Sequence, residues 1–183
     1  DNFAMGESVG RFTGEIIRDE LGGRARVVVL TLDNNETVEA RTRGLISGLA
    51  DVAPEAEIVA QVRGAVREWG RASVERLLAD GVSFDVIMSI NDAGSFGAIE
   101  ALQAASIPTD AVIITSVDAE ALALRYIHDG TYMRSSLAVA RREFAEGAVD
   151  IMVKMLAGSP VPEFVTIPVG EMITKDNLPE TTQ

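Results

Sequence analysis

Short apolar runs recur along the chain and alternate with longer segments of helical periodicity. The first run, Arg26 to Leu32 (RVVVLTL), is rich in β-branched residues and apolar on both faces, which favours a strand buried within a sheet. Apolar residues between Glu36 and Leu49 then follow helical spacing. Strands that alternate with helices imply right-handed crossovers and a parallel sheet covered on both faces. The sequence therefore predicts an α/β fold, a doubly wound parallel sheet flanked by helices.

The same alternation places the remaining elements. We expect strands at 26–32, 57–62, 86–90, 111–117 and 132–137. We expect helices at 5–21, 36–49, 69–80, 93–105, 119–128 and 140–157. Ligands in such sheets bind beyond the carboxyl ends of the strands. The polar residues at those ends are therefore candidates for a site, with a helix N-cap as the alternative role for each Asn and Asp: Asp33, Asn34, Asn35, Arg63, Asn91, Asp92 and Asp118.

Charge and composition exclude several classes of partner. The 28 acidic and 16 basic residues give a formal charge of −12, which should repel nucleic acid and anionic membranes. No apolar run approaches the roughly 20 residues of a membrane span. The start lacks both an initiator Met and the pattern of a signal peptide, so we expect the natural N-terminus to be missing. We expect a soluble globular domain with no nucleic-acid partner.

Enzyme motifs are missing from the sequence. It contains no nucleophile elbow, Walker loop, dinucleotide fingerprint or zinc-protease motif, and the one histidine, His128, stands at a predicted helix end. Asp33 to Glu36 (DNNE) is acidic but lacks the alternating ligands and central Gly of a calcium loop. We predict no catalytic residues, no metal and no cofactor. An enzyme that uses Asp33 or Asp118 as an acid or base is the least favoured alternative.

Two groups of glycines suggest close packing. Gly6, Gly10 and Gly14 repeat at four-residue spacing on the first predicted helix, which we expect to pack closely on the sheet. Gly94 and Gly97 lie in the helix after the third strand, and without a Lys they favour close helix packing over phosphate binding.

Four residues near the predicted strand ends suit a sugar. Trp69, the only tryptophan, can cover the apolar face of a sugar ring, and its alternative role is a hydrophobic cap on its helix. Arg43 offers a planar donor fork, with a solvated surface arginine as the alternative. Asn91 and Asp118 offer a donor and acceptors for hydroxyl groups.

These residues stand in motifs that resemble the type I periplasmic sugar-binding proteins of ABC transporters, near the ribose- and galactose-binding branch. The matching segments run over nearly the whole chain: DNFAMG (1–6), ARTRG (40–44), REWGR (67–71), SIND (89–92), and Val117 with Asp118. The resemblance implies ligand contacts from Arg43, Trp69, Asn91 and Asp118, with a contribution from Asp33 and Asn34. Two departures leave the exact sugar open: Ala138 replaces a ligand-binding Gln, and Ala119 replaces a Gly.

The resemblance also implies a role and a location. The chain would be the C-terminal lobe of a periplasmic or membrane-anchored extracytoplasmic receptor, which binds a sugar or polyol between two lobes and presents it to an ABC permease. The alternative is the ligand-sensing domain of a LacI-like regulator or a membrane sensor. LacI-like regulators usually have a threonine-rich strand after the last turn and an Arg-Ser ending. Both features are absent from this sequence, which favours the transporter branch.

The resemblance divides the chain into three parts. Residues 1–138 would form the ligand-binding lobe, 139–168 a crossover helix and segment that pack on the missing N-terminal lobe, and 169–183 a returning strand and tail. The helix at 140–157 carries an apolar stripe, and we expect it to pair with the same helix of a second chain when the other lobe is absent. The stripe consists of Phe144, Ala148, Val149, Met152, Val153 and Leu156.

Overall fold

The computed structural model describes residues 1–32 and 35–179, and it confirms the doubly wound α/β fold. The strands are β1 (Arg26–Thr31), β2 (Glu57–Arg63), β3 (Val86–Ser89), β4 (Ile113–Asp118), β5 (Met133–Ala138) and β6 (Met172–Ile173). The helices are α1 (Asn2–Glu20), α2 (Glu36–Val52), α3 (Arg67–Ala79), α4 (Asp92–Ala104), α5 (Ala121–His128), α6 (Arg141–Leu156) and the 3-10 helix η1 (Lys175–Asn177). The strand order is β2-β1-β3-β4-β5-β6, parallel except for the antiparallel β6.

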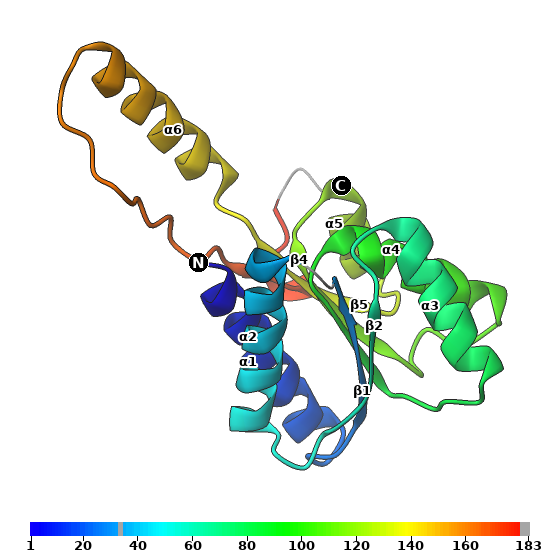
Figure 1. The fold of residues 1–183 in the computed structure, drawn as a ribbon. Coiled ribbons are helices and arrows are strands. Elements are labelled where there is room, and N and C mark those ends of the chain that lie inside the picture. The colour runs from blue at the N-terminus through cyan, green and yellow to red at the C-terminus, as the bar shows by residue number, and fades with distance from the viewer. Residues whose placement is uncertain (33–34, 180–183) are drawn as a thin grey trace.

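Helices cover the sheet on both faces (Figure 1). The alternating side chains of β1 divide between two cores: Val27 and Val29 pack with α1 and α2, whereas Val28 and Leu30 pack with α3, α4 and α5. This alternation, together with the full burial of these four residues, explains why the run of apolar residues in β1 is continuous.

Glycines of α1 pack against α2, whereas we expected them to pack against the sheet. A Cβ atom on Gly6 or Gly10 would collide with the backbone carbonyls of Arg41 and Leu45, so these glycines fit α1 to α2 and not to the sheet. On the other face, a Cβ on Gly97 would collide with the Arg67 carbonyl of α3. The expected close helix packing at Gly97 is thus confirmed.

The segment after β5 extends away from the sheet (Figure 1). Helix α6 has no buried residue, and Phe144, Met152 and Leu156 of its apolar stripe are 65%, 55% and 90% exposed. The chain returns beside its outgoing path, where the Ala138 amide donates to the Glu171 carbonyl at 2.8 Å, and then pairs β6 with β5. Among the described residues, no helix is long and apolar enough to span a bilayer.

Candidate functional site

The order of the strands reverses between β1 and β3, because the chain builds outward from β1 to β2 and then from β3 to β5 on the other side. In doubly wound sheets, such a switch point opens a crevice at the carboxyl ends of the strands. At this edge of the sheet lie the beginning of α2, the residues Ile90 and Asn91 after β3, and the end of β4.

Arg41 is the arginine of α2 that contacts the loop after β3 at this edge of the sheet. Its guanidinium group donates to the Ile90 carbonyl at 2.6 Å and, through two nitrogens, to Asn2 Oδ1 at 3.1 and 2.7 Å. The side chain therefore ties the beginning of α1 to the loop after β3. Burial lowers the pKa of Arg41, and the charge of Asp118 acts in the opposite direction.

Asp118 ends β4 with a half-buried carboxylate between two arginines. Nη2 of Arg141, the first residue of α6, lies 3.9 Å from its Oδ1, and Arg41 acts on it through its charge. Burial raises the pKa of Asp118, while Arg41, Arg141 and the backbone amide of Asp92 lower it. Two cationic groups and one carboxylate at one strand end form a set of charged donors and acceptors suited to hydroxyl groups.

Behind Asp118 lies the fully buried carboxylate of Asp92, the first residue of α4. Its Oδ1 accepts hydrogen bonds from the hydroxyls of Ser116 and Ser136, the second at 2.7 Å, and its Oδ2 accepts one from the Glu120 amide at 2.7 Å. Burial raises the pKa of Asp92 to about 6, although these hydrogen bonds act to lower it. Sequence reasoning placed Asp92 at a strand end but assigned it no role in the site.

Asn91 is the N-cap of helix α4, which is the alternative role that we predicted for it. Its Oδ1 accepts from the Gly94 amide at 3.0 Å, and its Nδ2 donates to the Ala65 carbonyl at 2.7 Å. The amide keeps one N–H and one oxygen lone pair for other partners. Ligand contact by Asn91 therefore stays a prediction.

Trp69 lies in the first turn of α3, half-buried, and pairs with Arg63 at the end of β2. The guanidinium carbon of Arg63 lies 3.1 Å from the centroid of the indole, a cation–π contact that covers one ring face. Because β2 is separated from β4 by β1 and β3, this pair lies roughly three strand spacings of about 4.8 Å from Asp118. Stacking of a sugar on the covered face would require Arg63 to move.

Arg43 does not join the other residues, which corrects the predicted convergence. It is exposed on α2, whereas Arg41, two residues earlier, contacts the crevice. Helical spacing could have identified this arginine, since Arg41 lies three residues after Val38 and four before Leu45 on the apolar side of the helix. Asp33 and Asn34 lie outside the described residues.

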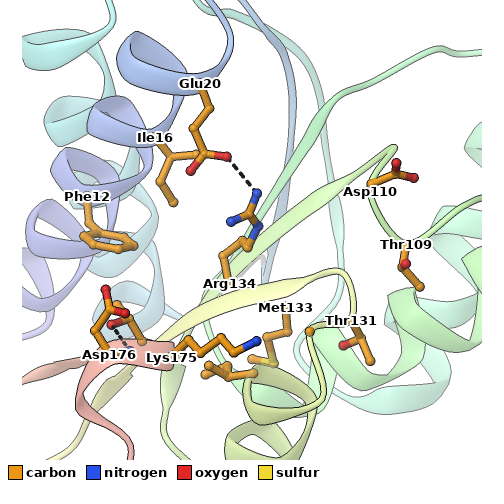
Figure 2. A pocket seen from close by; sticks show the side chains of 13 residues that line it. Phe12, Ile16, Glu20, Thr109, Asp110, Thr131, Met133, Arg134, Lys175 and Asp176 are labelled. Carbon is orange, nitrogen blue, oxygen red and sulfur yellow. Dashed lines mark hydrogen bonds and ion pairs between the residues drawn. The ribbon is translucent and has the colours of Figure 1, made fainter.

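The other candidates lie away from the crevice. His128 is exposed at the end of α5, with its Nδ1 2.9 Å from Asp129 Oδ1. The described residues contain no cluster of three potential metal ligands. A pocket of about 530 Å³ lies between α1, the beginning of β5 and η1 (Figure 2), with Phe12, the Glu20–Arg134 ion pair and Lys175 in its lining. It also contacts Thr109 and Thr131, which precede β4 and β5, and so occupies the opposite edge of the sheet.

Comparisons with known proteins agree on the type of fold. Residues 1–160 match the family described as a periplasmic binding protein domain. A Rhizobium meliloti protein named for rhizopine binding is 32% identical over 163 residues, which cover 87% of this chain and 52% of that protein.

Solved structures are similar over nearly the whole chain. A Mycobacterium smegmatis protein in complex with β-D-fucofuranose has a TM-score of 0.85 and 26% identity, with 96% of this chain and 57% of that chain covered. A periplasmic solute-binding protein of an ABC transporter from Actinobacillus succinogenes 130z, with bound D-allose, has a TM-score of 0.84 and 20% identity, with 96% and 60% covered. The chain thus spans between 52% and 60% of the length of these three relatives.

Proposed function

The chain belongs to the periplasmic binding protein family, and on this premise we propose that it is a ligand-binding lobe of a sugar or polyol receptor that serves an ABC permease. The family is described as a periplasmic binding protein domain, and the relatives from Rhizobium meliloti and Actinobacillus succinogenes are named as binding proteins. The regulator alternative is not favoured by these relatives.

The observation that carries this proposal is the place of Arg41 and Asp118 on the two sides of the switch point, where the charge of each acts on the pKa of the other. An arginine held in place by Asn2 and Ile90 presents a fixed donor fork, and the neighbouring carboxylate supplies acceptors. Hydroxyl groups on adjacent carbons of a sugar ring can both donate and accept, and charged partners strengthen these hydrogen bonds. We assign ligand contacts to Arg41, Asp118 and Asn91, and we keep Asp33 and Asn34, which follow β1 in the sequence, as predicted contacts.

The segment at 139–168 has a separate role in this proposal. Its outgoing and returning paths run side by side at Ala138 and Glu171. We propose that in a two-lobed receptor it packs on the opposite lobe, which would cover the exposed stripe of α6. Ligand held between two such lobes stabilises their closed arrangement.

A matched pair of arginine variants tests the site. Calorimetric titration of the two-lobed receptor proposed above would use D-allose, D-galactose, L-arabinose, D-fructose and myo-inositol as probes. We expect Arg41→Lys to weaken binding of the tightest probe about 10-fold or more, because a lysine cannot reproduce the planar fork. Arg43→Lys, two residues away on the exposed side of α2, should leave the affinity within about twofold, as expected of a surface change.

Two results would count against the assignment. Equal effects of the Arg41 and Arg43 variants would exclude Arg41 as the ligand contact, and the absence of measurable binding of every probe would remove the sugar-receptor proposal. Trp69→Ala separates the two roles of the tryptophan: weaker binding by about 1 to 3 kcal/mol supports stacking on the ligand, and unchanged binding supports a role only as the platform for Arg63.

A further inference from the structure

The turn after β4 has an unusual backbone conformation for residues that are not glycine. Asp118 has φ = 120° and Ala119 has φ = 49°, so two successive residues adopt positive φ. Side chains with a Cβ atom disfavour this region, which persists only where the surroundings hold it. A specific set of contacts must therefore offset the strain at the residue that presents the Asp118 carboxylate.

Those contacts converge on Asp92. Its Oδ2 accepts the Glu120 amide directly at 2.7 Å, and its Oδ1 accepts the Ser136 hydroxyl, whose oxygen in turn accepts the Ala119 amide at 2.9 Å. The two amides that follow Asp118 are thus both bound, one directly and one through a serine. The Ser116 hydroxyl, two residues before Asp118, donates to the same carboxylate.

The position of Asp92 in the sheet makes this arrangement possible. It follows β3, while Ser116 and Ser136 are register partners on β4 and β5, so one buried carboxylate joins the ends of three adjacent strands. Hydrogen bonds to a charged acceptor are stronger than neutral ones, and an amide left without an acceptor in a buried site is costly.

From these contacts we infer that Asp92 is a positioning residue, which holds the Asp118–Ala119 turn in its left-handed conformation and thereby directs the Asp118 carboxylate toward Arg41. The inference rests on the proposed function in one respect, namely that the turn presents a ligand contact. We call the hydrogen bonds from Asp92 and Ser136 to the turn the clamp, and they form without any ligand.

Amide hydrogen exchange on the 183-residue protein tests the clamp without ligand. In Asp92→Ala, we expect the Ala119 and Glu120 amides to exchange about 10- to 100-fold faster, while the Leu45 amide in α2 changes much less. Asp92→Asn should restore most of the protection, because its oxygen can accept the Glu120 amide and its NH₂ can donate to both serines. Ser95→Ala is the matched control: it removes a buried hydroxyl of α4 that bonds only the Asn91 carbonyl, 3.3 Å away.

A second measurement connects the clamp to binding. With the tightest sugar of the probe set, Asp92→Ala and Ser136→Ala should weaken affinity about 10-fold or more, whereas Asp92→Asn and Ser95→Ala should stay within about threefold. If Asp92→Ala fails to fold, Ser136→Ala tests the same turn, because it removes the acceptor of the Ala119 amide. Unchanged exchange at Ala119 in Ser136→Ala, or equal acceleration of all amides in Asp92→Ala, would overturn the inference. Failure of the wild-type two-lobed receptor to bind any probe would refute the proposed function and leave the exchange test of Asp92 intact.

Discussion

Asp92 should make the stability of the protein depend on pH. Burial raises the pKa of its carboxyl to about 6 in the folded protein, from an ordinary value of 3.8. The Asp118 charge acts in the same direction, whereas Ser116, Ser136 and the Glu120 amide oppose it. A carboxyl whose folded pKa is raised contributes stability that is present below its unfolded pKa and lost as the pH rises through the folded pKa.

The variant Asp92→Asn lacks this titration. The gap between about 6 and 3.8 corresponds to about 3 kcal/mol, at about 1.4 kcal/mol for each pH unit. We therefore expect the free energy of unfolding of the wild type, minus that of the variant, to fall by about 2.4 kcal/mol between pH 4 and pH 7, since the carboxyl of the unfolded chain is already partly ionised at pH 4. Urea unfolding at several pH values measures this difference, and a difference that stays constant over this range would show that Asp92 has an ordinary pKa.

Ala119 provides a second test at the scale of one residue. A glycine at this position tolerates φ = 49° without the Cβ strain that alanine carries. We expect Ala119→Gly to raise the free energy of unfolding by about 1 kcal/mol, even though glycine increases the entropy of the unfolded chain. Ala121→Gly, at the beginning of α5, should instead lower it, because the helical conformation there favours alanine. Thermal unfolding measures the stability of both variants. An Ala119→Gly variant less stable than Ala121→Gly would contradict this expectation.

At the scale of elements, the contact between α1 and α2 depends on glycines that leave no space for a side chain. A Cβ at Gly10 would overlap the Leu45 carbonyl of α2, and backbone atoms cannot move aside as a flexible side chain can. We expect Gly10→Ala to lower the free energy of unfolding by about 2 kcal/mol or more, through forced separation of the helices. Because Asn2 of α1 also holds Arg41, the same change should disturb the crevice.

The matched control for Gly10 lies in α6. A Cβ at Gly147 meets only Ile167 Cδ1, at 3.9 Å, an ordinary contact. Gly147→Ala should therefore be neutral or stabilise α6 by up to about 1 kcal/mol, the difference in helix propensity. Equal destabilisation by both substitutions in chemical denaturation would mean that close approach of the helices is not the cause.

At the scale of the whole molecule, the exposed apolar surface of α6 is the feature that bears on association of the chain. Val149 and Val153 of the apolar stripe are 55% and 58% exposed, and Met155 is 62% exposed. An apolar surface of this kind is unusual on a stable monomer. We expect the 183-residue chain to self-associate through α6, because a surface with two-fold symmetry can cover itself.

Sedimentation equilibrium at increasing concentration measures this association. Met152→Glu should shift the protein toward monomer by placing a charge in the apolar surface. Arg142→Gln changes the net charge by the same amount on the polar side of α6, where Arg142 pairs with Glu146, and should leave association unchanged. A wild-type chain that stays monomeric at high concentration with α6 folded would contradict the expectation.

The sequence alone determined the order of the elements and the edge of the sheet at which to look. Buried strands produce continuous apolar runs and helices produce a different period, so the doubly wound fold and the polar strand ends at Asn91 and Asp118 could be read directly. The motifs indicated the family, which the comparisons confirm.

Tertiary structure decided which of these residues meet. Arg41 and Arg43 stand two residues apart in the sequence, but a helix turns by about 200° over that distance, so only Arg41 reaches the crevice. The shared carboxylate of Asp92 depends on the place of β3 beside β4 and on the register of Ser116 with Ser136. Such contacts arise between segments far apart in the chain, and local periodicity contains no information about them.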